Sequence, residues 1–560
     1  MDDSLVFGNQ SQNPRDGGQP PVQPVSQPEP VTIPEQGAQF SPQSSQPIVP
    51  QPEQPQPIPS PQVFQQEPVP QAAQPVVSQL ERQPEPQPSL TQSPPQFSTE
   101  APMQYAQGPI PPSLGAAEVF PPRPPSRFNK NLFLKIGIGI VGLIILVVAG
   151  IFLYQKFSAP KQVTLTWWGL WEDAPVMQGI ISDFERLHPT ITVQYVKQDP
   201  NQYRDRLVAR IQNGTGPDIF RYHNSWLPMV SKTLLPLSSD VITPQAFKSA
   251  YYPVMQQDLV KNGAIYGVPL ESDSLALFIN TDVLSAASQQ APSNWDDFVK
   301  AAQSMTVRDD KGKIQVAGAA LGTYGNVEHA PDILATLFAQ QGIDFKRFAD
   351  PTAVQGQTDV LNFYTSFATG TQPVWDKSLD NSLLAFSRGE LAMYLGYSWD
   401  VFRVQQLNKQ LHFGIYPIPQ LYNKQTAIAS YWVEGVSSGT KNPKEAFLFM
   451  QYLTQRSTAQ RLYTDIAKTR SFGEPYARAD LAQTSKDSGI VYPFIQQMPY
   501  ATSSYFASDT HDGPAGLNSQ ANTYLENAVN GITDNSTSAD SAVTTLDQGI
   551  AQVLQQYGIR

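Results

Sequence analysis

The chain has 560 residues, which is too long for one ordinary domain, and it carries a formal net charge of −11 with no cysteine. The acidic balance argues against nucleic acid as a partner, because phosphate groups bind to concentrated Lys and Arg. The lack of cysteine excludes disulfides and a lipid-modified cysteine anchor. Composition also changes along the chain, since 31 of the 52 prolines precede Asn131.

The N-terminal segment, residues 1–131, repeats Pro, Gln, Ser and Glu and contains few aliphatic side chains. Such a segment cannot bury enough apolar surface to offset the entropy of ordering it, so we predict that it is disordered. Pro-Gln repeats such as residues 51–57 favour extended polyproline-like structure and indicate a semi-stiff spacer. A PxxP-type ligand for another protein is the alternative.

An apolar stretch follows at residues 132–153 and is uncharged from Ile136 onward. As a helix it would extend about 33 Å, enough to cross a bilayer core. We therefore predict one transmembrane helix over residues 132–154, because a cleaved signal peptide has a shorter apolar run nearer the N-terminus. Flanking cations favour a cytoplasmic tail and an exported C-terminal part. Four precede or open the stretch and two follow it: Arg123, Arg127, Lys130 and Lys135, then Lys156 and Lys161.

The exported part opens with a regular alternation of strand and helix patterns. Strands are predicted over residues 163–168, 191–196 and 219–222. The two intervening helices are indicated by apolar residues at helical spacing, namely Met177, Ile180, Ile181, Phe184 and Leu187, and Tyr203, Leu207, Val208 and Ile211. The β-α-β-α-β order predicts a mainly parallel sheet with helices on both faces.

Two loops that follow these strands are rich in aromatic and amide side chains: WGLWED at residues 168–173 and YHNSW at residues 222–226. Open parallel sheets place their ligand sites at the carboxyl ends of the strands. A single loop aromatic usually packs against its own domain. Two such loops at the same sheet edge favour a binding site.

Further segments occur in a fixed order along the chain: FERLHP at 184–189 with ITV at 191–193, GPD at 216–218, IYGVP at 265–269 with LFIN at 277–280, PSNWDDF at 292–298, FSRGELAM at 386–393 leading to Trp399, and KNPKEA at 441–446. In these segments and their order the sequence resembles bacterial extracellular solute-binding protein family 1. That family includes the maltose-binding and other oligosaccharide-binding components of ABC importers. The resemblance runs from about residue 163 to residue 554.

The resemblance implies an α/β fold of the periplasmic-binding-protein type II kind, with two lobes, a hinge and an interlobe cleft over residues 160–560. Lobe one would hold about 161–270 and 430–480, and lobe two about 274–420 and 481–560. The implied function is a membrane-anchored extracytoplasmic protein that captures a small solute, a mono- or oligosaccharide, for the permease subunits of an ABC importer. Alternatives are a surface sensor or adhesin of the same fold, and a glycoside-processing enzyme that uses Glu172 and Glu271.

The resemblance also implies a set of solute-binding residues. By position these are Trp168, Trp171 and Glu172 in the first loop, Asn224 and Trp226 in the next, Glu271 and Asp273 at the first crossover, Tyr324, Asn326 and His329, Tyr397 and Trp399, and finally Trp432 and Glu434. The last two replace a Gly-rich pair that is common in the family, which we expect to narrow the cleft. Indole and phenol rings stack on the C–H faces of sugars, and carboxylates and amides bind hydroxyls.

Other patterns have structural explanations. Asn294 before Asp296 and Asp297 is typical of a capped helix start, and Ser538 of another, so residues 534–540 are not interpreted as a calcium loop. The histidines lack metal-ligand spacing, and no nucleophile elbow or phosphate loop is present. We therefore expect no catalytic residue, no metal site and no cofactor.

Overall fold

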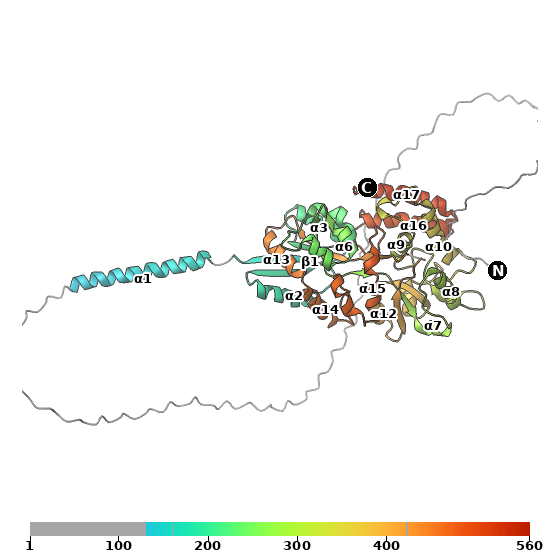
Figure 1. Ribbon diagram of the computed structural model, residues 1–560, viewed down its shortest axis with the longest axis horizontal. Coiled ribbons are helices and arrows are strands. Elements are labelled where there is room, and N and C mark those ends of the chain that lie inside the picture. The colour runs from blue at the N-terminus through green and yellow to red at the C-terminus, as the bar shows by residue number, and fades with distance from the viewer. Residues whose placement is uncertain (1–129, 159–160, 422–423, 560) are drawn as a thin grey trace, which may run out of the picture. The chain divides into compact units, whose positions relative to one another are not determined.

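The computed structural model describes residues 130–158, 161–421 and 424–559. In the sequence, a long helix, α1 (Lys130–Ser158), precedes an α/β part that extends to residue 559 (Figure 1). The segment that we expect to be disordered, residues 1–131, lies outside the described residues except for its last two.

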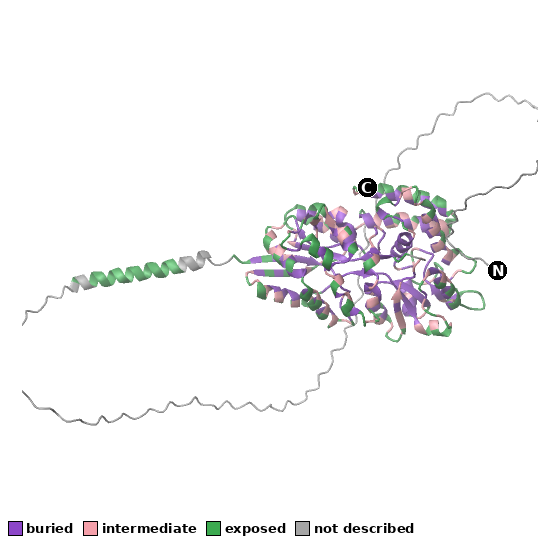
Figure 2. Cartoon of the chain, in the orientation of Figure 1, coloured by how far each residue is buried: buried purple, intermediate pink, exposed green. Residues whose placement is uncertain are grey.

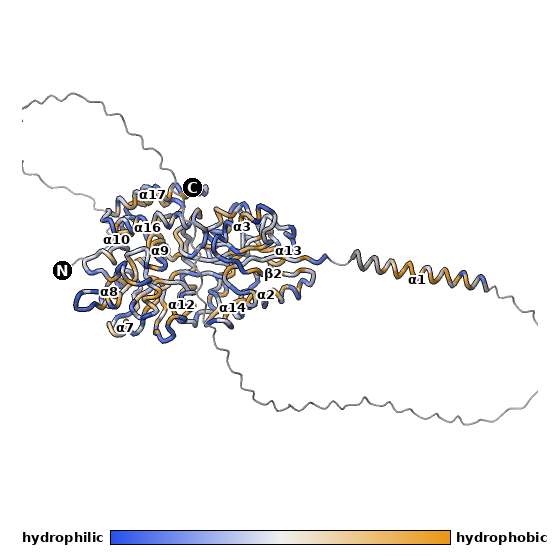
Figure 3. The backbone as a smooth tube through the Cα atoms, turned by 180° about the vertical axis from the view of Figure 1, so that it is seen from behind, coloured by the Kyte–Doolittle hydropathy of each residue, from blue (hydrophilic) through white to orange (hydrophobic). Residues whose placement is uncertain are grey.

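Helix α1 covers the apolar segment predicted over residues 132–154. Its stretch Leu134–Ile151 has a mean hydropathy of 2.6 and is long and apolar enough to cross a membrane. Apolar colour extends along most of this helix in Figure 3, and the side chains of that stretch are exposed.

The first sheet has the strand order β2-β1-β3-β15-β4, and β7 also pairs with β15. β1 is parallel to β2 and β3, in the register Val163↔Ile191 and Trp167↔Ile219, as the alternation of strands and helices predicts. β15 is antiparallel to β3, β4 and β7. The strands are β1 (Val163–Gly169), β2 (Ile191–Lys197), β3 (Ile219–His223), β4 (Leu234–Leu235), β7 (Val268–Pro269) and β15 (Trp432–Ser437).

The expectation of a mainly parallel sheet is therefore wrong beyond the first three strands. β15 enters the sheet about 200 residues after β3 and from the opposite direction, so its pairing leaves no local sequence signal. Every residue of β15 is nevertheless buried, as in a strand covered on both faces, although the strand includes Glu434 and Ser437. Figure 2 shows mainly buried residues along the strands of this sheet, although the edge strand β2 alternates between buried and exposed residues.

Helix α2 (Ala174–Leu187) shows how the predicted apolar face is used. Met177, Ile180, Ile181 and Phe184 are buried against the sheet as expected. Leu187, predicted on the same face, is instead 62% exposed, because the helix ends there, two residues before a proline. α2 packs beside α14 (Arg456–Ala467), which comes from the far end of the sequence.

The second sheet has the order β10-β11-β12-β9-β13. Only β11 and β12 are parallel, and β9 is antiparallel to both β12 and β13. α8 (Trp295–Met305) packs on β11, and its N-cap is Asn294, whose side chain accepts from the Asp297 amide, as predicted. The strands are β9 (Ala276–Asn280), β10 (Val307–Arg308), β11 (Ile314–Ala319), β12 (Leu391–Gly396) and β13 (Phe413–Pro417).

A third, small sheet lies where the chain passes between the other two. β8 (Asp273–Ser274) follows β7 of the first sheet and leads into β9 of the second. β14 (Ala427–Ser430) follows β13 and leads back into β15, and β16 (Ala501–Thr502) pairs with β14. β8 and β14 are antiparallel neighbours, with Asp273 opposite Ser430. Both crossings of the chain are thus hydrogen-bonded to each other.

The remaining helices cover the sheets. α16 and α17 form a pair that packs on α10, and α17 begins after Ser538, whose hydroxyl accepts from the Ser541 amide as predicted. A short hairpin joins β5 (Val260–Lys261) to β6 (Ala264–Ile265). The helices not yet given are α3 (Tyr203–Gln212), α4 (Leu227–Val230), α5 (Pro244–Ala250), α6 (Pro253–Leu259), α7 (Thr281–Ala286), α9 (Ala330–Gln340), α10 (Val354–Thr369), α11 (Ser382–Ser387), α12 (Asp400–Leu407), α13 (Pro443–Leu453), α15 (Tyr492–Ile495), α16 (Leu517–Asn535) and α17 (Ala539–Gln556).

Candidate functional site

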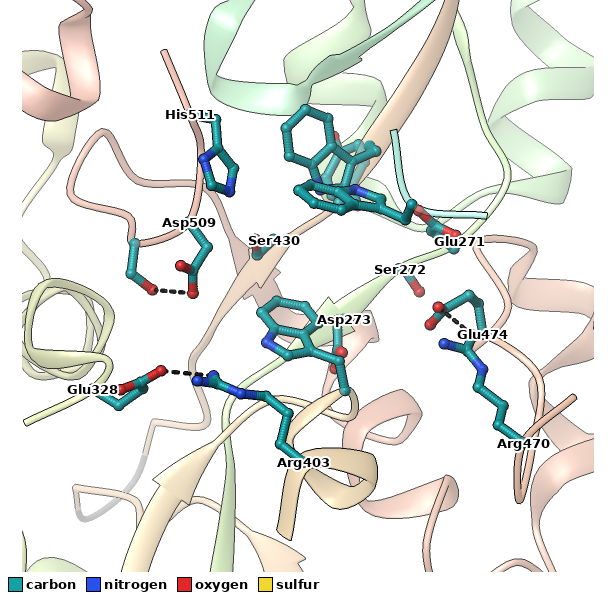
Figure 4. Close-up of a pocket in the computed structure, with 15 residues that line it drawn as sticks. Glu271, Ser272, Asp273, Glu328, Arg403, Ser430, Arg470, Glu474, Asp509 and His511 are labelled. Carbon is teal, nitrogen blue, oxygen red and sulfur yellow. Dashed lines mark hydrogen bonds and ion pairs between the residues drawn. The ribbon is translucent and has the colours of Figure 1, made fainter. Parts of the chain in front are cut away.

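A cavity of about 360 Å³ opens beside the two crossing strands and is bordered by loops of both large sheets. The first sheet contributes the loop after β1, the second the turn after β12, and the segment after α14 and that before α16 complete the wall. Figure 4 shows the lining side chains facing a common space. They are Trp171, Glu271, Ser272, Asp273, Glu328, Trp399, Arg403, Ser430, Tyr431, Trp432, Arg470, Glu474, Ser508, Asp509 and His511.

Three indole rings supply most of the apolar surface of the cavity. Trp171 is 36% exposed and meets the edge of Trp432 at a centroid distance of 5.3 Å. Trp399 is half-buried and stacks on Tyr397 at 4.3 Å. Each ring is held by a second aromatic group, since Trp432 also packs edge-on against Trp226 at 5.6 Å. Fixed aromatic faces of this kind suit the flat apolar side of a ligand.

The polar lining is dominated by carboxylates. Five of the lining residues are Asp or Glu and two are Arg. Arg403 pairs with Glu328 at 2.6 Å, and Arg470 pairs with Glu474 (Figure 4). Both cations of the lining therefore already have carboxylate partners.

Behind the first-sheet side of the cavity lies a buried cluster of charges centred on Arg221. Its guanidinium is 2.6 Å from a carboxylate oxygen of Glu172, 2.6 Å from one of Glu434 and 3.7 Å from one of Glu271. Burial opposes the charge of Arg221, but the three carboxylates outweigh it and raise the arginine pKa. Burial, with the nearby carboxylates, raises the pKa of Glu271 well above its usual range. One guanidinium is thus shared among three carboxyl groups.

The second-sheet side has its own buried network, centred on His329 at the start of α9. The imidazole lies 2.7 Å from Asp400 and 2.9 Å from the hydroxyl of Ser508. Burial lowers the pKa of His329, but Asp400 more than compensates and the pKa rises to about 9. The hydroxyl of Tyr397 donates to Asp332 at 2.7 Å, which fixes the ring under Trp399.

Five of the predicted site residues line this cavity. They are Trp171, Glu271, Asp273, Trp399 and Trp432. Five others lie directly behind the lining and hold it in place: Glu172 and Glu434 on Arg221, Trp226 under Trp432, and His329 and Tyr397 under Trp399. Trp432 and Glu434, which the resemblance treats as a pair, are two positions apart in β15, so their side chains leave the same face of the strand. The ring of Trp432 borders the cavity, and the carboxylate of Glu434 lies farther along the strand, buried against Arg221.

The other four predicted residues lie away from the cavity. Trp168 is buried in the core, because its position in β1 directs the ring toward Tyr203 at 6.5 Å. Asn224 donates to Asp258 and Ser503 at 3.2 Å and borders a different hollow. Tyr324 donates to the carbonyl of Asn522 at 3.2 Å, and Asn326 to the carbonyls of Asp376 and Leu379 at 3.0 Å. These contacts stabilise loops.

Several lining residues carry no signal that sequence reasoning could use. Arg470 and Glu474 follow α14 in an irregular segment, and Ser508 precedes Asp509 and His511 in another. Asp509 and His511 have positive φ values of 54° and 52°, a conformation that L-residues rarely adopt and that tertiary contacts must stabilise. Neither segment follows a strand of the large sheets, so the rule of strand carboxyl ends does not point to them.

The sequence profile described as bacterial extracellular solute-binding protein matches residues 168–460, a little over half of the chain. The chain is 24% identical over 349 residues to the multiple sugar-binding protein of Streptococcus mutans, covering 59% of this chain and 81% of that one. It is 23% identical over 330 residues to the maltodextrin-binding protein MdxE of Bacillus subtilis, covering 56% and 73%.

Solved structures of sugar-binding proteins share the fold of this chain. The sugar-binding protein MalE from Xanthomonas citri superposes with a TM-score of 0.57 at 19% identity, over 70% of this chain and 98% of that one. A cyclo/maltodextrin-binding protein complexed with maltotetraose gives a TM-score of 0.56 at 19% identity, over 71% and 99%. At this identity the comparison establishes the α/β fold of these periplasmic sugar-binding proteins.

Proposed function

Because the chain belongs to the bacterial extracellular solute-binding protein family, we propose that it is a membrane-anchored receptor that captures a mono- or oligosaccharide and delivers it to an ABC importer. The observation that carries the proposal is the composition of the cavity, in which Trp171, Trp399 and Trp432 stand among carboxylates and hydroxyls. Pyranose rings present C–H faces to indoles and hydroxyls to charged acceptors. Relatives named for sugar binding support the same ligand class.

The proposed capture mechanism is closure of two lobes on the solute. Lobe one consists of about 161–270 and 430–480, and lobe two of about 274–420 and 481–560. The two short connections through β8 and β14 between the large sheets support a hinge there. Binding energy favours closure because only the closed form lets Trp171 and Trp399 contact one solute together.

The proposed anchor is α1, with the Pro-rich residues that precede it as a cytoplasmic tail. Support comes from the apolar stretch Leu134–Ile151 and from the excess of cations on its N-terminal side. Protease added to intact cells should then degrade the part after residue 158 and spare the Pro-rich tail. Digestion of the tail with a protected C-terminal part would reverse the orientation and remove the basis for a receptor outside the cell.

The experiment that tests sugar capture is a thermal-shift screen of the purified chain against mono- and oligosaccharides, with peptides and polyamines as comparison classes. A solute at 100 times its Kd should add roughly 2.7 kcal/mol to the free energy of unfolding. Chromatography of the sugar after incubation distinguishes a receptor from a glycoside-processing enzyme, since a receptor returns the sugar unchanged. Shifts with peptides or polyamines alone would show that the sugar assignment is wrong.

A further inference from the structure

The charges around the cavity do not balance. Its five lining carboxylates face two guanidinium groups, and both of these are engaged by Glu328 and Glu474. Asp273 accepts hydrogen bonds from the backbone amides of Ser274 and Ser398, and no ion pair joins it to a cation within the described chain. The excess negative charge is thus a property of the cavity wall itself.

Acidic residues lie at both ends of the cavity, and Glu271 marks one of them. Figure 4 places Glu271 and Glu474 together on the side opposite Asp509 and His511. Glu271 is 9% exposed, and its Oε2 atom has no hydrogen-bond donor among the described residues. The charge of Glu474 acts on both Glu271 and Asp273 and raises the pKa of each, after burial, which is the larger cause. Glu474 is paired with Arg470 at the same end of the cavity, so Glu271 and Asp273 are the acids there that lack an arginine of their own among the lining residues.

Arg221, the cation nearest to Glu271, is shared with two other acids. Arg221 is 3.7 Å from Glu271, but it lies 2.6 Å from Glu172 and from Glu434, which are also buried. A single guanidinium therefore stands among three acids, and the raised pKa values of Glu271 and Glu434 reflect the cost of ionising all three. A bound cation would offset the cost of ionising these buried acids.

We propose that the captured solute is a cationic sugar, such as an amino sugar or its oligomer, whose ammonium group binds at Glu271 beside Asp273 and Glu474. This inference rests on the proposed function and names the class of sugar. The ammonium pairs with the carboxyl group of Glu271, and the indoles of Trp171, Trp399 and Trp432 bind the ring faces. Aromatic walls with an acidic end attract organic cations through both charge and ring quadrupoles.

A metal ion does not fit the same charges. Among the described residues, no group of three or more His, Asp or Glu side chains is arranged to hold one. A neutral sugar fits less well, because its hydroxyls donate to the carboxylates but bring no compensating charge into a buried, acidic end. The three indoles also line a space larger than a hydrated ion needs.

The test uses the full chain, purified in detergent, and matched sugars that differ only at one position. Glucosamine, N-acetylglucosamine and glucose form one set, and the β-1,4-linked dimers of each form another. Isothermal titration measures the affinity of each sugar for the wild type, for Glu271→Gln and for Glu474→Gln. Glu390→Gln is the charge-matched control, because Glu390 is exposed and does not line the cavity. Melting without ligand confirms that each variant is folded.

We expect the amine members to bind about tenfold or more tightly than their acetylated and hydroxyl counterparts. That preference should fall to less than about threefold in Glu271→Gln and remain in Glu390→Gln, and Glu474→Gln should reduce it if Glu271→Gln impairs folding. Equal or tighter binding of the neutral members would overturn the cationic class and leave sugar capture intact. Failure of every sugar in both sets to bind would overturn both.

Discussion

The two sides of the cavity are built alike and charged differently. On each, an indole lines the cavity beside a buried polar network: Trp171 directly precedes Glu172 of the Arg221 cluster, and Trp399 packs against His329. The first network sets one cation against three carboxylates. In the second, the buried pair of His329 and Asp400 sits at 2.7 Å and is matched in charge.

The difference in charge balance indicates that the two sides of the cavity have different roles. A matched, fully hydrogen-bonded pair rigidifies its surroundings and holds Trp399 and Tyr397 in place. In an unmatched cluster, ionised carboxyl groups are unfavourable unless a ligand supplies a compensating positive charge. We interpret the second-sheet side as a fixed platform and the first-sheet side as the side that selects the ligand.

The largest expected effect comes from removing Arg221, the cation on the first-sheet side of the cavity. Arg221→Met leaves three buried carboxylates without a counter-ion, and we expect the free energy of unfolding to fall by about 3–5 kcal/mol. Urea unfolding measures the loss. Adding Glu434→Gln to the variant should restore part of it by removing one of the acids. A loss no larger than that of an exposed Arg would show that the cluster is not held by charge.

The second side is tested by its pH dependence. The pKa of His329 is raised to about 9 in the folded protein, so its contribution is fully present below pH 6.5 and is lost as the pH rises through 9. The loss should be on the order of 3 kcal/mol. Urea midpoints of the wild type should fall over this range, and those of His329→Gln should fall less. Parallel profiles for the two proteins would contradict a protonated His329.

On the second-sheet side of the cavity, the proposed contact with the ligand is the ring of Trp399. The indole is half-buried and stacks on Tyr397, so Trp399→Ala should weaken solute binding about tenfold to a hundredfold while lowering Tm little. Titration with the best sugar of the screen measures the change, and Trp399→Phe should recover part of the affinity. A large loss of Tm with unchanged affinity would assign the ring to the core instead.

Local patterns predicted the fold up to the point where distant segments enter. The first three strands, α2 and α3, and the caps at Asn294 and Ser538 all follow from periodicity and capping chemistry. The antiparallel strand β15 could not be predicted in this way, because its partners are about 200 residues away. The family resemblance, and not periodicity, supplied the expectation that the chain returns to the first sheet.

The site was predictable where a residue lies at a strand end and unpredictable elsewhere. Trp171 follows β1 and Trp399 follows β12, and both line the cavity. Trp168 lies near the end of β1 and Asn224 directly follows β3, yet their side chains face the core and a neighbouring hollow. Composition cannot report the direction of a side chain on a loop. Arg470 and Asp509 reach the cavity from irregular segments, whose positions depend on tertiary packing alone.

The smallest expected effect is that of removing the charge of Glu271, an acid on the first-sheet side of the cavity. The pKa of Glu271 is raised by burial and by Glu172, Glu474 and Glu434, against Arg221. An acid whose pKa is raised on folding favours the folded state only at low pH and destabilises it as the pH rises through the folded pKa. Glu271→Gln removes that cost, so at neutral pH the Tm of the ligand-free chain should rise by roughly 1–2 °C. At a pH below the ordinary pKa of a carboxyl group the difference should vanish, because both proteins are then neutral at this position.

The exposed control Glu390→Gln should show neither effect. A fall in Tm for Glu271→Gln at neutral pH would mean that Arg221 already stabilises all three acids, and the two sides of the cavity would then be equally matched.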